Sequence, residues 1–273
     1  MSRIDSTFER LRRERRAGLV TYTTAGDPTL AESGKILRAL DEAGVDVLEV
    51  GVPFSDPLAD GPAIQRASER ALAAGATLDR VLSLVADVRP AVHAPIVLFS
   101  YANPIYRMGY AAFADRAAAA GVDGVLTLDL PIEESDDLRR ALIGRHVDMI
   151  FLLSPTTSDE RMQRAGSLGS GFLYAISRLG VTGARDTLSA GIDGFVTRIR
   201  RASAMPVVVG FGLSTPDHVA QVCRVADAAV VGSALVTVIE QASARGEPAA
   251  AAAARYVSWL RGSVDSAPSG SLV

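Results

Sequence analysis

Short apolar runs rich in β-branched residues alternate with longer amphipathic segments along almost the whole chain. Several of these runs lack polar alternation, which is typical of parallel strands buried on both faces. The pattern predicts repeated β/α units, with strands over residues 19–24, 45–50, 96–101, 122–128, 147–153, 171–176, 206–210 and 226–231. Helices are predicted between them, among others over residues 30–43, 111–120, 133–142 and 189–202.

Eight such units in 273 residues predict a single (β/α)8 TIM barrel of the α/β class. A doubly wound open sheet is the alternative, but its first turn usually contains GxGxxG, which residues 24–28 lack. Segments 62–74 and 78–88 predict two helices after the second strand, which are extra helices of the barrel and not a second domain. We therefore predict one catalytic barrel domain over residues 1–262 and a disordered tail over residues 263–273.

The amino-acid composition excludes several classes of function for this chain. A net charge of −3 argues against nucleic acid or an anionic membrane as the main partner. The basic run at residues 10–16 is interrupted by Leu11 and Glu14 and is interpreted as a solvated helix face. A single cysteine, Cys223, excludes an internal disulfide, and the chain shows neither a secretory signal nor a bilayer-length apolar stretch. These features predict a cytoplasmic protein.

The first candidate for chemistry is Glu49, near the end of the second predicted strand. A carboxylate between Leu48 and Val50 on a buried strand is unfavourable unless it is paired or functional. Catalytic groups of barrels lie at the carboxyl ends of strands, which favours function over a structural ion pair. Burial would raise the pKa of Glu49 and suit it to donating and accepting protons near neutrality.

Two further carboxylates, Asp56 and Asp60, follow in the proline-rich loop over residues 53–62. Loop aspartates usually cap turns, and both residues are open to that interpretation. Their position directly after the Glu49 strand, on the catalytic rim, favours a functional role for one of them.

Glycine-rich loops follow the last three predicted strands, at residues 180–183, 210–214 and 232–234. Loops after strands seven and eight are where barrels commonly bind phosphate, through backbone amides and a helix N-terminus. Each glycine pair alone is weak evidence, but three successive loops together predict a phosphate site. The three histidines show no metal-ligand spacing, so we predict neither a metal site nor a Ser-His-Asp triad.

Residues 48–62, Leu-Glu-Val-Gly-Val-Pro-Phe-Ser-Asp-Pro-Leu-Ala-Asp-Gly-Pro, resemble the signature of tryptophan synthase α subunits. Shorter segments agree in order and spacing, so the resemblance covers nearly the whole chain; they are residues 22–28, 101–104, 129–131, 177–183, 209–214 and 231–234. The chain departs from the family pattern at Thr21, Leu128 and Ile132, none of which is a matched catalytic or phosphate position.

The resemblance implies retro-aldol cleavage of indole-3-glycerol phosphate to indole and glyceraldehyde 3-phosphate, without metal or organic cofactor in this chain. Glu49 would be the general acid and base, Asp60 would accept the indole N–H, and Tyr174 matches an active-site tyrosine of the family. The remaining substrate contacts would be an apolar indole slot (Tyr22, Phe99, Leu126 and Phe211) and a phosphate end (Thr182, Gly183, Gly212, Gly232 and Ser233).

The family assembles with a pyridoxal phosphate-dependent β subunit, and an α2β2 complex is expected by resemblance. Segments 53–60 and 103–108 would face that partner, and residues 177–187 would close over the substrate as a lid. The open alternatives are a free-standing indole-3-glycerol phosphate lyase, a different phosphate-binding barrel such as an isomerase or epimerase, and a chain that only regulates a partner.

Overall fold

The computed structural model describes residues 1–176, 188–210 and 212–264 of the chain. In these residues eight parallel strands, each hydrogen-bonded to the next in sequence order, close a barrel as β8 pairs with β1. The predicted fold class is therefore confirmed. The strands are β1 (Gly18–Thr24), β2 (Val47–Gly51), β3 (Ile96–Ser100), β4 (Gly124–Thr127), β5 (Asp148–Leu153), β6 (Leu173–Ile176), β7 (Val207–Gly210) and β8 (Ala228–Val231).

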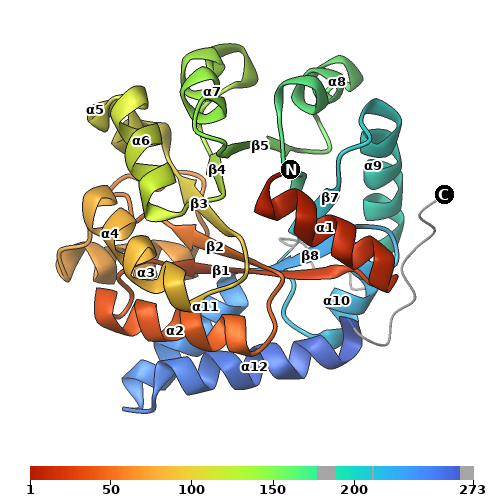
Figure 1. Cartoon of the computed structure of the whole chain (residues 1–273). Helices are drawn as coiled ribbons and strands as arrows, with labels where there is room; N and C mark the ends of the chain where they lie inside the picture. Colours follow the sequence, from red (N-terminus) through yellow and green to blue (C-terminus); the bar gives the residue numbers. More distant parts are fainter. Residues whose placement is uncertain (177–187, 211, 265–273) are drawn as a thin grey trace.

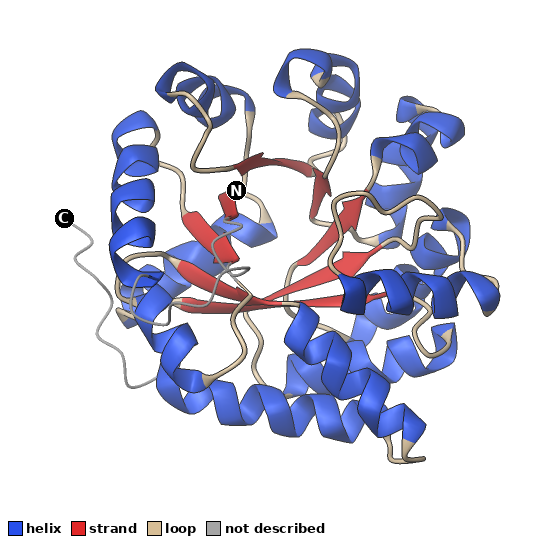
Figure 2. Ribbon diagram, turned by 180° about the vertical axis from the view of Figure 1, so that it is seen from behind, coloured by secondary structure: helices blue, strands red, loops and turns tan. Residues whose placement is uncertain are grey.

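Helices surround the strands on all sides (Figure 1), and the view from behind shows the same ring (Figure 2). They are α1 (Arg3–Glu14), α2 (Leu30–Glu42), α3 (Pro62–Ala73), α4 (Leu78–Val88), α5 (Ala102–Met108), α6 (Tyr110–Ala120), α7 (Asp136–Ile143), α8 (Asp159–Leu168), α9 (Leu188–Ala202), α10 (Pro216–Cys223), α11 (Ser233–Ala244) and α12 (Ala249–Val264). Short 3-10 turns are η1 (Arg89–Ala91) and η2 (Ile132–Glu134). The two helices predicted after β2 are α3 and α4.

The barrel has two apolar layers. The outer layer joins the strands to the surrounding helices, and the inner layer fills the barrel with side chains such as Val97, Leu126 and Ile150. Helix α1 lies across one end of the barrel (Figure 1), where Phe8 and Leu11 belong to the inner layer. This plug leaves the opposite end, where the strands terminate, as the open face.

Aspartates hold the amino ends of three strands. Asp46, Asp123 and Asp227 each precede a strand and accept a backbone N–H at the start of a neighbouring strand, at 3.0, 2.8 and 2.8 Å respectively. These carboxylates satisfy amides that would otherwise be buried without a partner. The amino end of the barrel is thus built for stability.

The basic run was only partly interpreted correctly. Arg10 and Arg16 form ion pairs with the buried Asp46, at 3.0 and 2.9 Å, and only 14% of the Arg16 side chain is exposed. Arg12 and Arg13 are exposed, as expected for a solvated face. Arg10 and Arg16 are not simply solvated because the buried carboxylate of Asp46 requires cationic partners, and α1 supplies one of them.

Two boundaries differ from the sequence prediction. The helix expected over residues 133–142 begins later, at Asp136, because η2 comes first and the Ser135 hydroxyl donates to the Ile132 carbonyl at 2.8 Å. Helix α12 continues to Val264, past the predicted start of the tail, and residues 265–273 lie outside the described residues. Cys223 is buried, and burial raises the pKa of its thiol to about 12.

Across residues 1–176, 188–210 and 212–264, no helix is both long and apolar enough to span a bilayer.

Candidate active site

A cavity of about 350 Å³ lies at the carboxyl ends of the strands. Its walls combine tyrosine and phenylalanine rings, aliphatic side chains, one carboxylate and several backbone glycines. The lining residues are Tyr22, Ala59, Asp60, Gly61, Ile64, Phe99, Leu128, Leu152, Tyr174, Ile176, Gly210, Gly212, Val230, Gly232 and Ser233. The cavity brings together residues from both ends of the sequence, and seven of them were predicted as site residues: Tyr22, Asp60, Phe99, Tyr174, Gly212, Gly232 and Ser233.

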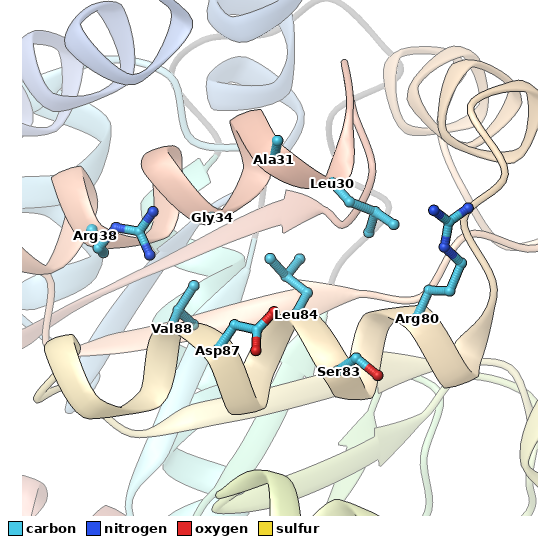
Figure 3. A pocket seen from close by; sticks show the side chains of 9 residues that line it. All are labelled: Leu30, Ala31, Gly34, Arg38, Arg80, Ser83, Leu84, Asp87 and Val88. Carbon is cyan, nitrogen blue, oxygen red and sulfur yellow. The ribbon is translucent and has the colours of Figure 1, made fainter.

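A second hollow, of about 440 Å³, lies outside the barrel between α2 and α4 (Figure 3). Its polar side chains, which include Arg38, Arg80 and Asp87, project from the surfaces of the two helices. It contains none of the predicted site residues and lies away from the carboxyl ends of the strands. Size alone therefore does not identify the reactive cavity.

Glu49 lies on β2, in register with Tyr22 of β1 and Val97 of β3. It is completely buried, and both carboxylate oxygens lack a hydrogen-bond partner among the described residues. Burial raises the pKa of Glu49 to about 8, because the charged form loses its hydration. The carboxyl is therefore largely protonated at neutral pH and can act as a proton donor, with no cationic partner among the described residues.

The surroundings of Glu49 are aromatic. It acts electrostatically on the hydroxyls of Tyr22 and Tyr174, which both line the cavity. Glu49 itself is not among the lining residues, so it lies behind the cavity wall, beside these two tyrosines.

Two glycines make room for the tyrosines. A Cβ at Gly51 would collide with the hydroxyl of Tyr22, and a Cβ at Gly210 would lie 2.7 Å from the hydroxyl of Tyr174. Each glycine lies on a strand adjacent to that of its tyrosine. These two strand glycines therefore leave the space that the tyrosine side chains occupy.

Asp60 lies in the loop after β2, within a turn in which its N–H donates to the Pro57 carbonyl at 3.2 Å. Burial raises the pKa of Asp60 to about 6, and a hydrogen bond with the Tyr101 side chain opposes that rise. Gln65 of α3 donates to the Asp60 carbonyl at 2.9 Å. Asp60 is the carboxylate that lines the cavity, whereas Asp56 is exposed and accepts from the Ser55 hydroxyl at 2.6 Å.

The far side of the cavity is formed by backbone. Gly232 is the N-cap of α11, and no side chain caps this helix. The first N–H groups of a helix have no partner within it, and they attract anions together with the helix dipole. Gly212, with a φ of +67°, and Ser233 complete this side. The arrangement suits a phosphate group.

The apolar slot is made of rings and aliphatic side chains. Phe99 packs edge-on to Tyr22 with ring centroids 5.3 Å apart, and its ring lies 6.3 Å from that of Tyr174. Leu126 does not line the slot, contrary to prediction: it is fully buried in the inner layer below. Leu128, two residues later on the same side of the chain, lines the cavity in its place.

Several lining residues were missed by sequence reasoning: Ile64, Leu128, Leu152, Ile176 and Val230. The period of two along a strand could have found four of them, because inward positions nearest the carboxyl end face the cavity.

Phe211, Thr182, Gly183 and the predicted lid over residues 177–187 lie outside the described residues. Among the described residues, no group of three or more His, Cys, Asp or Glu could hold a metal ion.

Taken together, the closed barrel, the buried carboxyl with no cation beside it among the described residues, and the helix N-terminus without a side-chain cap define a TIM-barrel enzyme. Its site suits acid–base chemistry on a substrate with a flat apolar group at one end and an anion at the other.

Comparison with known proteins identifies the particular member of this class. The family model described as "Tryptophan synthase alpha chain" matches residues 8–264. The tryptophan synthase alpha chain of Geobacter sulfurreducens is 50% identical over 89% of this chain and 92% of its own length. That of Burkholderia thailandensis is 48% identical over 98% of both chains. The solved structure of the alpha subunit from Legionella pneumophila has a TM-score of 0.91 and 39% identity, covering 97% of this chain and 99% of that one.

The chain belongs to the tryptophan synthase alpha chain family. It is the lyase component that cleaves indole-3-glycerol phosphate to indole and glyceraldehyde 3-phosphate in tryptophan biosynthesis. The family and activity expected from the sequence resemblance are confirmed, and the isomerase, epimerase and regulator readings are set aside.

Proposed function

We propose that Glu49 and Asp60 perform the cleavage, with Glu49 as the proton donor and acceptor and Asp60 as the charge-stabilising group. The observation that supports this most is the buried Glu49 carboxyl, which has no hydrogen-bond partner among the described residues and a pKa raised to about 8. An acid that remains protonated at neutral pH can protonate C3 of the indole ring and then act as a base.

Protons and electrons balance between Glu49 and the substrate. The proton of Glu49 moves to C3, which interrupts the aromatic pyrrole and leaves an iminium-like cation. The Glu49 carboxylate then removes the proton of the glycerol hydroxyl next to the breaking bond. An aldehyde forms there, the C–C bond breaks, and its electron pair restores the indole.

Asp60 would accept the indole N–H in its ionised form and offset the positive charge that develops on the ring. The phosphate would bind at the N-terminus of α11 with Gly212, Gly232 and Ser233, with Thr182 and Gly183 as further contacts. Tyr22, Phe99 and Phe211 would hold the ring, and Tyr174 would border the reacting carbon. Binding energy from the phosphate, remote from the breaking bond, would orient the indole against Glu49.

We further propose that the chain works in the cytoplasm as the α subunit of an α2β2 complex, with pyridoxal phosphate only on the β subunit. The similar chains from Mycobacterium tuberculosis come from structures of tryptophan synthase, with 34% identity and a TM-score of 0.88 for one of them. Leu58 and Tyr106 are 93% and 70% exposed, and they lie in the segments 53–60 and 103–108 that would face the partner. A partner that binds these two segments would cover both exposed apolar side chains.

Indole release from indole-3-glycerol phosphate, measured for the full chain with and without a β subunit, tests the assembly. We expect slow release by the chain alone and strong acceleration by β. Rapid release that β does not change would contradict the α2β2 proposal and favour a free-standing lyase. Glu49→Gln in the same assay is the control for adventitious cleavage.

The pH dependence of kcat/KM should be bell-shaped, with a maximum between the pKa values of the two carboxyls. Asp60, with a pKa raised to about 6, must be ionised, so activity falls as the pH drops below that value. Glu49, with a pKa raised to about 8, must start protonated, so activity falls as the pH rises above that value. The substrate phosphate also titrates near pH ~6. A profile that keeps rising well beyond the Glu49 pKa would contradict its role as the initial acid.

A further inference from the structure

We propose that Tyr101 is a positioning residue that holds the Asp60 carboxylate in place for the reaction. The inference rests on the proposed role of Asp60 and extends it to a residue far away in the sequence. Tyr101 does not line the cavity, and its side chain is buried at the junction between the end of β3 and the loop after β2.

Tyr101 contacts the Asp60 loop in three ways. Its ring packs on Phe54, with centroids 4.9 Å apart and planes inclined by 30°. Its hydroxyl oxygen accepts the backbone N–H of Ala59 at 3.0 Å. The same hydroxyl has a side-chain hydrogen bond with Asp60. Because a tyrosine hydroxyl has one proton and accepts at its oxygen, it can accept from Ala59 and donate to Asp60 at the same time.

The backbone around Tyr101 is itself fixed. The Ser100 hydroxyl donates to the Tyr101 carbonyl at 2.9 Å. The next N–H, of Ala102, donates to the Asp129 carboxylate at 2.6 Å, where Asp129 follows β4. Tyr101 therefore projects from a framework held by two strands, and the proline-rich loop is attached to that framework through its hydroxyl and ring.

The second attachment of the loop differs in kind. Gln65 of α3 donates to the carbonyls of Asp60 and Pro57, at 2.9 and 3.4 Å. Gln65 anchors only the backbone, whereas Tyr101 anchors the backbone at Ala59 and also acts on the Asp60 carboxylate. The two residues can therefore be used to separate anchoring of the loop from stabilisation of the charge.

The titratable groups that act on Asp60 come from two strands. Tyr22 on β1 has an electrostatic interaction with it, and Tyr101 after β3 donates to it. Asp129 acts on the Tyr101 hydroxyl from the end of β4, and Glu49 acts on Tyr22. Of these groups, Tyr101 opposes the rise that burial causes in the pKa of Asp60. Loss of its hydroxyl should therefore make Asp60 harder to ionise.

Tyr101→Phe tests the inference because it retains the ring on Phe54 and removes only the hydroxyl. Hydrogen bonds to charged groups contribute enough for an expected fall in kcat of about 10-fold or more, with KM changed much less. The acidic limb of the kcat/KM profile should move to higher pH. The substrate phosphate titrates identically in every variant, so a shift between variants reports on the protein.

Three comparisons make the result specific. Tyr110→Phe removes a hydroxyl outside the cavity and should leave the profile unchanged. Gln65→Met should lower the rate through a looser loop without moving the acidic limb. In the Asp60→Asn background, Tyr101→Phe should add little further loss, because the group through which it acts has been removed.

The possible results distinguish a failure of the role proposed for Tyr101 from a failure of the role proposed for Asp60. An acidic limb that stays in place in Tyr101→Phe, or losses that multiply in the double variant, would overturn the role of Tyr101 while leaving that of Asp60 intact. A wild-type rate in Asp60→Asn would instead overturn the proposed role of Asp60. Direct NMR titration of the Asp60 carboxyl in folded Tyr101→Phe protein provides a second measurement of the same shift, independent of turnover.

Discussion

Glu49→Gln is expected to abolish indole release while the variant stays folded and still binds an indole-propanol phosphate analogue. A positioned acid–base group typically contributes about 100- to 10,000-fold, and glutamine can neither donate nor accept the transferred proton. Steady-state turnover and analogue titration would measure the two effects separately. Turnover close to that of the wild type would remove Glu49 from the mechanism.

The free energy of unfolding of Glu49→Gln should depend on pH differently from that of the wild type. The pKa of Glu49 is raised from its ordinary value to about 8 in the folded protein. The folded state therefore holds a proton that the unfolded state releases, and wild-type stability falls as the pH rises from the ordinary value towards 8. Above that range the loss amounts to several kcal/mol. Glu49→Gln lacks this dependence, so its stability relative to the wild type should improve with pH in denaturant unfolding experiments.

An improvement of this kind would indicate that the site is functional. A buried carboxyl with a raised pKa destabilises the fold at alkaline pH, and glutamine of similar shape relieves that effect while ending turnover. If the difference in unfolding free energy between the two proteins did not change with pH, Glu49 would not have the raised pKa on which its role depends.

Asp60→Asn is expected to cause a large but incomplete loss of kcat/KM, of about 100-fold, comparable to the loss of one electrostatic contact to a transition state. The asparagine carbonyl can still accept the indole N–H, but it has no charge to offset the cation on the ring. Asp56→Asn provides the matched control in the same loop, because Asp56 is exposed and does not line the cavity. Equal losses in the two variants would point to the loop as a whole and not to the charge of Asp60.

Much of the fold could be predicted from the chain alone. Apolar runs without alternation identified the parallel strands, since strands covered on both faces have little need of polar residues. The rule that barrel chemistry lies at the carboxyl ends of strands then selected Glu49, the pair Asp56 and Asp60, and the glycine-rich loops, and the family resemblance singled out Asp60, Gly212 and Gly232. The fold prediction succeeded because it depends on local pattern, whereas the roles of the site residues stay predictions, although several of these residues line one cavity.

Other features could not be predicted because they depend on how separate strands align. Leu126 fills the inner layer and Leu128, just after β4, lines the cavity, and the alignment of β4 with its neighbours decides which of them reaches the cavity. The contact between Arg16 and Asp46 and that between Tyr101 and Ala59 join segments that lie 30 and 42 residues apart.

The sequence by itself determined the class of fold and the end of the barrel where chemistry is expected, because hydrophobic periodicity and strand order are local properties of the chain; the resemblance to a family added roles for the candidate carboxyls Glu49 and Asp60. Only the tertiary structure decided that Glu49 is buried with no hydrogen-bond partner among the described residues, and that Asp60 has a tyrosine from another strand beside it. The physical reason is that the ionisation of a carboxyl depends on its hydration and on the charges and donors around it. Those are set by packing between distant segments.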